Sequence, residues 1–447
     1  MSSPIQHQPA TADASQTSGW GARTATATIS RARWGIGDQG LSSLTNFLVA
    51  AAAAKLGSRV EFGAFSVALT VYILLLWVAR SLISEPYVVR LTASAEREMR
   101  LAGNDAVATA AGIGSLAGGA MLSISMVSGA AWAPLIAVMG IAMPALLVQD
   151  TYRYLLFAAG RPRAAAAIDA VWLGVSLVAF LLLGSRITVF SLAAIFGAGS
   201  AVSAGAGVWL ARVRPSLRSP LKWFRRHGDL GFPFLLELIT VNGMPALTML
   251  LVAALGNVTT VGALRAAILL VSPVTVIVGG VFMVATPEAV RARLRSPRAL
   301  KKVIVALAGA TSLMVLAWSG LVALVPGRLG TLMLGSNWAP GRQLLVPVAL
   351  QTVANTCILA GSVGLRVLEG VQKSLRLRAW AAPLFIAAGL AGNYIGGPMG
   401  TAVGLAVAAW ASAGLTWMEV GKAFGSKQAD GPQLDTPGAK AYVEGPG

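Results

Sequence analysis

The sequence predicts an all-α polytopic membrane protein of about twelve transmembrane helices, arranged in two related halves. Of its 447 residues, 56% are hydrophobic and only 12% are charged, and the mean hydropathy is +0.71. This composition is typical of helical membrane proteins and excludes an ordinary soluble enzyme. The formal charge of +18 does not indicate nucleic-acid binding, because the basic residues alternate between predicted membrane loops.

Twelve apolar segments have the length of a membrane-spanning helix, roughly 20 residues. They cover residues 36–56, 63–83, 106–128, 132–152, 164–183, 188–210, 232–254, 262–284, 302–325, 342–364, 377–395 and 400–420. With the N-terminus inside, 29 of the 35 Lys and Arg residues fall on the inner side, as the positive-inside rule requires. We therefore expect a multi-pass protein of the cytoplasmic membrane with both termini in the cytoplasm.

Polar composition marks the ends of the chain and a division in its middle. The predicted parts are a disordered cytoplasmic tail of residues 1–34, an N-lobe of residues 35–210, a linker of residues 211–230, a C-lobe of residues 231–420 and a second disordered tail of residues 421–447. The linker carries six basic residues together with Trp223 and Phe224. Such a stretch is expected to lie on the anionic inner leaflet.

A self-match at an offset of 199 residues indicates that one half is a duplicate of the other. The matched positions are Asp38 with Glu237, Leu56-Gly57 with Leu255-Gly256, Gly63-Ala64 with Gly262-Ala263, Ala68 with Ala267 and, two residues further out of step, Pro86 with Pro287 and Arg90 with Arg291. Chance is the alternative, because Gly and Ala are abundant here. A repeat in a membrane protein predicts a site between the halves.

The first span carries a polar face. At about 100° per residue, Asp38, Ser42, Thr45 and Asn46 share one side of the helix, which has to face other helices or a water-filled cavity. Asn46 is a candidate for substrate binding. Asp38 and its repeat partner Glu237 are candidates for coupling transport to protons or cations, because a carboxylate in a low dielectric can change its charge. The alternative is an interfacial carboxylate at a helix start.

Three further polar residues are candidates for substrate binding. Arg265 is expected about one turn inside the eighth span, where its guanidinium could hold a phosphate through two hydrogen bonds. The alternative is an arginine that extends to the outer headgroups. Gln351 and Asn355 lie on the tenth span, where hydrogen bonds between helices are the favoured alternative.

Four charged residues are candidates for an inner gate. Asp150 and Arg153 are one helical turn apart, and Asp169 follows the turn that carries Arg161. They could form a latch of ion pairs, and the alternative is local pairing near the membrane surface.

The sequence contains no catalytic or metal-binding motif, and we expect no cofactor. Cys357 is the single cysteine, and the two histidines, His7 and His227, are far apart in the sequence. This pattern does not fit a metal site. The outer loops are short and carry no cluster of carboxylates, which disfavours a membrane glycosyltransferase or polymerase.

A series of motifs resembles one family of transporters. They are Asp38-Gln39-Gly40-Leu41-Ser42-Ser43-Leu44-Thr45-Asn46-Phe47, Glu61-Phe62-Gly63-Ala64-Phe65, Ser84-Glu85-Pro86 with Arg90, Gln149-Asp150 with Arg153, Gly160-Arg161-Pro162-Arg163, Gly262-Ala263-Leu264-Arg265-Ala266-Ala267 with Pro273, Pro287-Glu288, Asn337-Trp338-Ala339-Pro340 and Gly364-Leu365-Arg366-Val367-Leu368. In this order, over residues 35–420, they resemble the lipid-linked oligosaccharide flippases (O-antigen and teichoic-acid type) of high-GC Gram-positive bacteria. This family belongs to the multidrug/oligosaccharidyl-lipid/polysaccharide exporter superfamily. Glu369-Gly370-Val371-Gln372 departs from its pattern.

The resemblance implies two pseudo-symmetric six-helix bundles around a central cavity. It also implies that the chain moves a polyprenyl-(pyro)phosphate-linked oligosaccharide across the membrane by alternating access, for cell-surface polysaccharide synthesis. The implied partners are this lipid, the membrane lipids and the glycosyltransferases or polymerase of polysaccharide assembly. The alternatives are a cation-coupled drug antiporter of the same fold, a membrane-embedded glycosyltransferase or polymerase, and a membrane scaffold that transports nothing.

Overall fold

The computed structural model describes residues 43–429, apart from residues 93, 131, 216–219, 240–242, 256 and 370. The described residues form helices joined by short connections, as the apolar spans predict. The predicted N-terminal tail lies outside the described residues. The last helix continues to Ala429, so the first nine residues of the predicted C-terminal tail are helical.

The N-lobe runs from the first helix to α7. Its elements are the first helix (Ser43–Leu56), α2 (Arg59–Ala79), the π-helical turn η1 (Arg80–Ser84), α3 (Glu85–Leu91), α4 (Glu96–Val127), α5 (Ala133–Ala158), α6 (Pro162–Leu183), the short 3₁₀ turn η2 (Gly184–Arg186) and α7 (Val189–Ala211). α2 begins with a capping box, in which Ser58 and Glu61 each bind the other's backbone N–H. Such a box satisfies amide groups that a helix start leaves unpaired.

The C-lobe follows the connecting helix α8 (Pro220–Leu238). Its elements are α9 (Met244–Ala254), α10 (Val258–Arg295), α11 (Pro297–Ala323), α12 (Gly327–Leu334), the 3₁₀ turn η4 (Gly335–Asn337), α13 (Trp338–Gln343), α14 (Leu345–Glu369) and α15 (Val371–Ala429). The backbone of α15 leaves the helical conformation at Gly396 and Gly397. The positive φ of 54° at Gly397 favours glycine, and it turns α15 into two antiparallel helices.

The described parts of the twelve predicted spans are helical. Residues 36–42 of the first span lie outside the description, and the span predicted at 232–254 is divided between the end of α8 and α9. Nine described helices are long and apolar enough to cross a membrane, and Ser43–Leu56 and Met244–Ala254 are shorter apolar helices. The long span Pro383–Gly425 contains the turn at Gly396 and Gly397 and therefore counts twice. The protein is an all-helical, multi-pass membrane protein with six spans in each lobe.

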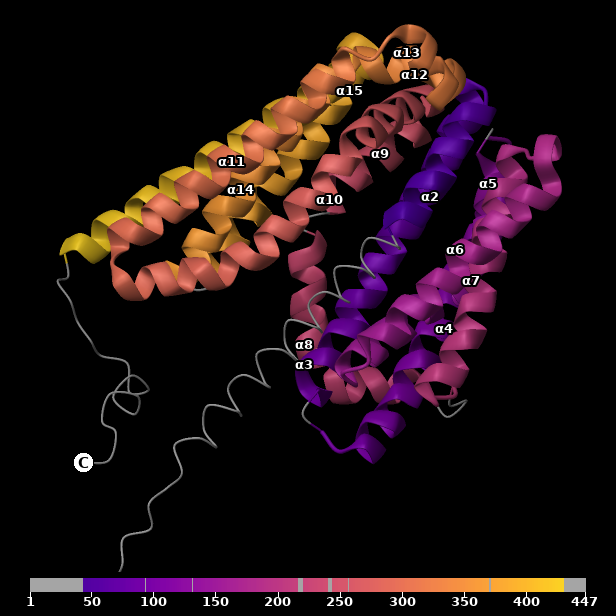
Figure 1. The fold of residues 1–447 in the computed structure, drawn as a ribbon, viewed down its shortest axis with the longest axis horizontal. Coiled ribbons are helices and arrows are strands. Elements are labelled where there is room, and N and C mark those ends of the chain that lie inside the picture. Colours follow the sequence, from indigo (N-terminus) through magenta and orange to yellow (C-terminus); the bar gives the residue numbers. More distant parts are fainter. Residues whose placement is uncertain are drawn as a thin grey trace, which may run out of the picture.

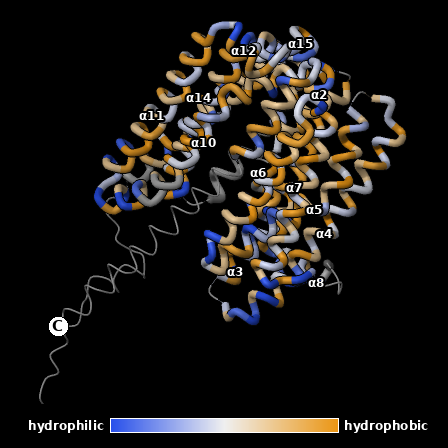
Figure 2. Tube along the Cα trace, turned by 45° about the vertical axis from the view of Figure 1, so that its right-hand side comes forward, coloured by the Kyte–Doolittle hydropathy of each residue, from blue (hydrophilic) through white to orange (hydrophobic). Residues whose placement is uncertain are grey.

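The two lobes lie together at one end of the molecule and diverge toward the other (Figure 1). We call the end with α12 and α13 the closed end and the opposite one the open end. Figure 2 shows hydrophilic residues gathered at the ends of the helices, around α3 and α8 for example, with hydrophobic segments between them. This distribution suits helices that cross a membrane.

Glycines bring the lobes into contact at the closed end. A Cβ atom on Gly63 of α2 would lie 2.3 Å from the carbonyl oxygen of Val258 in α10, and one on Gly262 would lie 3.0 Å from the Cα of Gly63. Asn337 adds polar contacts, since its side-chain amide donates to the carbonyl oxygens of Ala54 at 2.8 Å and Gly57 at 3.0 Å. The closed end is therefore held by backbone packing and by hydrogen bonds between the lobes.

Small residues also allow close packing within each lobe. A Cβ atom on Gly118 of α4 would lie 2.3 Å from the carbonyl oxygen of Gly140 in α5. In the hairpin of α15, one on Gly392 would lie 2.1 Å from the carbonyl oxygen of Gly400. Such contacts are typical of membrane helices, which associate through close backbone approach rather than through a hydrophobic effect.

The linker forms helix α8 and packs against the N-lobe. The indole N–H of Trp223 donates to the carbonyl oxygen of Leu82 at 2.9 Å, a group that Pro86, four residues further along, cannot pair because proline has no N–H. Trp223 is 1% exposed and stacks on Tyr87. The sequence places Trp223 on the lipid leaflet, whereas the structure buries it in protein, because only the tertiary fold brings Leu82 and Tyr87 to it.

Candidate functional site

A cavity of about 620 Å³ lies between the lobes. Its walls come from the first helix and α2 of the N-lobe and from α10 of the C-lobe. The lining residues are Ser43, Leu44, Asn46, Phe47, Ala50, Tyr72, Ile73, Leu76, Trp77, Arg80, Arg265, Ile268, Leu269, Ser272, Pro273, Thr275 and Val276. Its volume is in the range of ligand-binding pockets. Below, it is called the arginine cavity, because Arg80 and Arg265 both line it.

Arg265 brings a positive charge to the C-lobe wall of this cavity. α10 begins at Val258, so Arg265 lies about two turns inside the helix, roughly 10 Å from its start, rather than the one turn that the sequence predicts. Its Nε is buried and has no hydrogen-bond partner among the described residues. The side chain as a whole is half-buried, and an anion in the cavity could accept from this buried N–H group.

The π-helical turn η1 places Arg80 on the opposite wall. Its guanidinium binds both carboxylate oxygens of Asp150, through Nε at 2.8 Å and Nη2 at 2.7 Å, and lies 5.5 Å from the ring centre of Tyr154. The Arg80 side chain remains 25% exposed, whereas that of Asp150 is 5% exposed. π-Helical turns within α-helices occur often at functional sites. Arg80 is therefore the cavity-facing member of a buried ion cluster.

The rest of this cluster lies inside the N-lobe. Arg153 contacts Asp150 through Nη1 at 3.1 Å and Asp169 through Nε at 3.1 Å, and the side-chain amide of Gln149 donates to Asp169 at 2.7 Å. Two arginines and two aspartates balance in charge, which is how buried ions are tolerated. The cluster joins η1, α5 and α6 within one lobe, so its pairs do not by themselves form a latch between the lobes.

Several predicted site residues lie apart from the cavity and the cluster. Arg161 is exposed, and its Nη1 donates to the carbonyl oxygen of Leu210 at 2.7 Å. Gln351 is half-buried and Asn355 exposed on α14, and neither lines the arginine cavity. The structure thus places Asp150, Arg153 and Asp169 together and leaves Arg161 outside their cluster.

The coupling candidates lie outside the part of the chain whose side chains are described. Asp38 precedes the described residues. Glu237 falls in the last turn of α8, and its side chain is outside the description. The role of both carboxylates stays a prediction. Asn46, on the same predicted face as Asp38, lines the arginine cavity.

The sequence missed Arg80 as a member of the site. By hydropathy alone, Arg80 is one more charged residue near the end of a span. Its partner Asp150 lies 70 residues away in the sequence, so no local pattern of residues indicates the pair. The one available signal is the motif Ser84-Glu85-Pro86, because a proline just after an apolar span often marks a local change of helix geometry.

Comparisons with known proteins are informative at the level of the fold. No protein-family model matches the sequence, and no curated protein matches it. Among solved structures, an inward-facing multidrug resistance MATE family transporter of the MOP superfamily superposes with a TM-score of 0.71 at 14% identity, covering 87% of this chain and 96% of that one. The lipid II flippase MurJ in an inward closed conformation superposes with a TM-score of 0.66 at 12% identity, covering 90% of this chain and 88% of that one. This chain has the two-lobe transporter fold.

The solved structures also differ in how well their conformations superpose on this chain. The outward-facing MATE family transporter superposes with a TM-score of 0.57 at 14% identity, covering 90% of this chain and 96% of that one. The inward-facing structure therefore fits this chain better than the outward-facing one.

Proposed function

We propose that this protein is a flippase that moves a polyprenyl-(pyro)phosphate-linked oligosaccharide across the cytoplasmic membrane by alternating access. The observation that carries the proposal is the charge of the arginine cavity. Arg80 and Arg265 line it, and no Asp or Glu does among the described residues. Because Arg80 is already neutralised by Asp150, Arg265 supplies the charge that attracts a phosphate.

The closed and open ends supply the two gates that alternating access needs. Under the predicted topology, the closed end with Asn337 faces outside, and the open end, with the basic segments around α8, faces the cytoplasm. The cavity is then open to the side on which a lipid-linked sugar is made. Opening of the contact between Gly63 and Gly262 would release the headgroup to the other side.

A transport assay tests the proposal. The full chain is reconstituted in liposomes that contain a fluorescent polyprenyl-diphosphate oligosaccharide, and translocation is followed by quenching from outside. We expect Arg265→Ala to lose at least about tenfold in rate and Arg265→Lys to lose less, because lysine keeps the charge but not the forked donors. Full transport by Arg265→Ala at normal protein levels would overturn the proposal.

A cation-coupled drug antiporter is the second candidate, favoured by the TM-score of 0.71 to the multidrug transporter. A cationic drug needs aromatic or acidic contacts, and Tyr72, Trp77 and Phe47 supply aromatic ones. The two functions respond oppositely to Arg265, since removing a positive charge should weaken transport of an anionic lipid and strengthen that of a cation. Export of a fluorescent cation by wild type, increased in Arg265→Ala, would favour the antiporter.

A further inference from the structure

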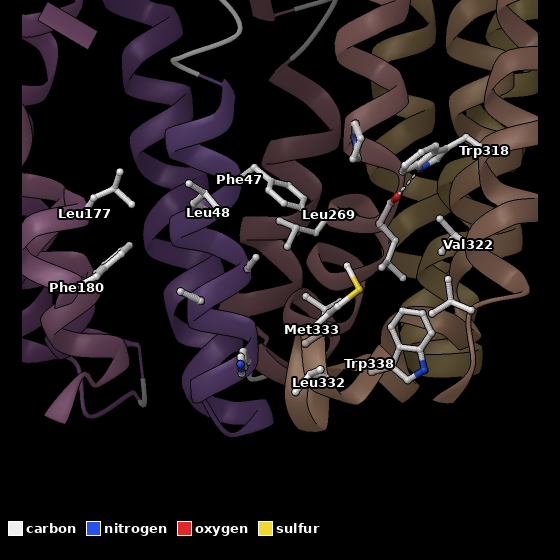
Figure 3. A pocket seen from close by; sticks show the side chains of 17 residues that line it. Phe47, Leu48, Leu177, Phe180, Leu269, Trp318, Val322, Leu332, Met333 and Trp338 are labelled. Atoms are coloured by element: carbon white, nitrogen blue, oxygen red, sulfur yellow. Dashed lines mark hydrogen bonds between the residues drawn. The ribbon is translucent and has the colours of Figure 1, made fainter. Parts of the chain in front are cut away.

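A second hollow lies between the lobes, next to α12 at the closed end (Figure 3). It has a volume of about 430 Å³, and its lining residues are apolar apart from Lys55, near the end of the first helix. The first helix and α6 contribute from the N-lobe, with Ala52 and Leu177 among the lining residues, and α10, α11 and α12 contribute from the C-lobe. We call this hollow the apolar groove.

The apolar groove and the arginine cavity share a wall. Phe47 of the first helix and Leu269 and Pro273 of α10 line both hollows. Arg265 stands one turn before Leu269 on the same helix. A single molecule could therefore place a charged group at Arg265 and an attached apolar chain in the groove.

Two backbone carbonyl oxygens of this wall, those of Leu269 and Leu270, are paired by nearby side chains. Pro273 has no N–H for the carbonyl oxygen of Leu269, four residues earlier. The hydroxyl of Ser272 donates to that oxygen at 2.8 Å. On the groove side, the indole N–H of Trp318 donates to the carbonyl oxygen of Leu270 at 2.8 Å, which fixes the indole against the wall (Figure 3).

We propose that the apolar groove holds the hydrocarbon chain of the same lipid whose phosphate binds at Arg265. The inference rests on the proposed function and adds the place of the tail. On one side of the wall is a guanidinium whose buried Nε has no partner among the described residues, and on the other is an apolar hollow. Together they match a ligand with an anionic head and a long chain. Joining the two contacts in one molecule raises its affinity above that of either part. Bulk lipid in the groove is the competing occupant, and it would give no dependence on chain length.

Binding to the purified full chain tests the inference with three probes: a long-chain polyprenyl diphosphate, geranyl diphosphate and inorganic pyrophosphate. We expect wild type to bind the long-chain probe at least about tenfold more tightly than geranyl diphosphate, because a longer chain buries more apolar surface in the groove. Ala52→Trp fills the groove from the first helix and should remove this preference. Its affinity for inorganic pyrophosphate should equal that of wild type.

Matched variants separate the possible outcomes. Ala411→Trp places the same side chain on an exposed face of α15 and should keep the preference for the long chain. Leu177→Trp fills the groove from α6 and serves where Ala52→Trp does not fold. A long-chain preference that survives in a folded groove variant overturns the groove as the tail site and leaves the proposed function intact. Unchanged pyrophosphate affinity in Arg265→Ala overturns the proposed phosphate site instead.

Discussion

Gly63 and Gly262 lie against each other between the lobes, with 3.0 Å between the Cα of Gly63 and the position of a Cβ on Gly262. The same two glycines are equivalent in the 199-residue self-match of the sequence. A duplicated unit whose copies face each other would place equivalent positions near the axis between them. The contact is thus the structural counterpart expected of that repeat.

Adding a side chain at Gly63 should open the closed end. A Cβ there would meet the backbone of Val258 at 2.3 Å, and backbone cannot move aside without separating α2 from α10. Overpacking of this kind costs about 1–3 kcal/mol, and 1.4 kcal/mol changes an equilibrium about tenfold. We expect Gly63→Ala to increase the labelling of Ala54→Cys by a membrane-impermeant thiol reagent, in a Cys357→Ser background.

Gly279→Ala is the control for this experiment. Gly279 lies on α10 with nothing within 4 Å of a built Cβ, so its substitution should leave the labelling of Ala54→Cys unchanged. Equal labelling in Gly63→Ala and wild type would mean that the glycine contact does not hold the closed end.

We expect the charge of Arg265 to lower the free energy of unfolding, although it serves the binding of the proposed phosphate ligand. Its Nε is buried without a partner among the residues that the structure describes, so replacing Arg265 by an apolar residue of similar length removes a partly buried charge. We expect Arg265→Met to unfold at a temperature equal to or above that of wild type, with a gain of up to about 2 kcal/mol. Thermal unfolding in detergent, with no lipid added, measures this.

Arg342→Met provides the comparison. Its guanidinium is exposed and donates to the carbonyl oxygen of Ala323 at 2.9 Å, so losing it should change stability little or lower it slightly. A clear loss of stability in Arg265→Met would indicate that Arg265 has a structural partner, and its role as a free phosphate ligand would then be wrong.

The sequence predicted the spans because the bilayer requires about 20 apolar residues for each crossing, and this requirement does not depend on tertiary contacts. It also placed Arg265 and Asn46 at a site between the lobes, since a polar group within a span has to face protein or water. It could not tell which side of α14 faces the arginine cavity, and Gln351 and Asn355 do not line it. It could not pair Arg80 with Asp150, because a contact across 70 residues depends on how α2 and α5 pack.

The ion pair between Arg80 and Asp150 should be needed for a stable N-lobe. Asp150 also contacts Arg153, so Asp150→Asn would leave two guanidiniums with one carboxylate, that of Asp169. Removing one partner of a buried ion pair costs about 3–5 kcal/mol. We expect Asp150→Asn to lower the unfolding temperature markedly, and the double variant Arg80→Met/Asp150→Leu to recover part of the loss.

A solvent-exposed ion pair provides the control for the unfolding temperature of Asp150→Asn. Glu288 pairs with Arg291 at the surface of α10, where such pairs contribute about 0–1 kcal/mol. Glu288→Gln should therefore unfold close to wild type. An Asp150→Asn protein as stable as Glu288→Gln would show that the cluster does not support the N-lobe.

The packing of α8 on the N-lobe should weaken in acid. Arg90 of α3 donates to Nδ1 of His227 at 3.3 Å and to the carbonyl oxygen of Arg226 at 2.6 Å, and it pairs with Asp229. Burial, and secondarily the charge of Arg90, lowers the pKa of His227 below its ordinary value of 6.5, although Asp229 and Asp105 act in the opposite direction. Arg90 likewise lowers the pKa of Asp229 from 3.8, chiefly by its hydrogen bond.

The pKa values of His227 and Asp229 are both lowered in the folded protein, so both groups weaken the contact of α8 as the pH falls. A histidine whose folded pKa is depressed binds its proton more readily when α8 is detached, so the contact is complete above about pH 6.5 and is lost as the pH falls through the lowered pKa. Asp229 adds to this only below its ordinary pKa of 3.8, so His227 alone governs the range above about pH 4. Protonation would also remove the acceptor that Nδ1 offers to Arg90 and place two cations side by side.

Hydrogen exchange of α8 at about pH 7.5 and about pH 5, corrected for the intrinsic rate at each pH, measures the effect. We expect wild type to lose protection in residues 222–236 at the lower pH, while α5, in the interior of the same lobe, keeps its protection. His227→Gln retains an oxygen acceptor for Arg90 and does not titrate, so its α8 should be equally protected at both values. The same loss of protection in His227→Gln as in wild type would assign the pH dependence to another group.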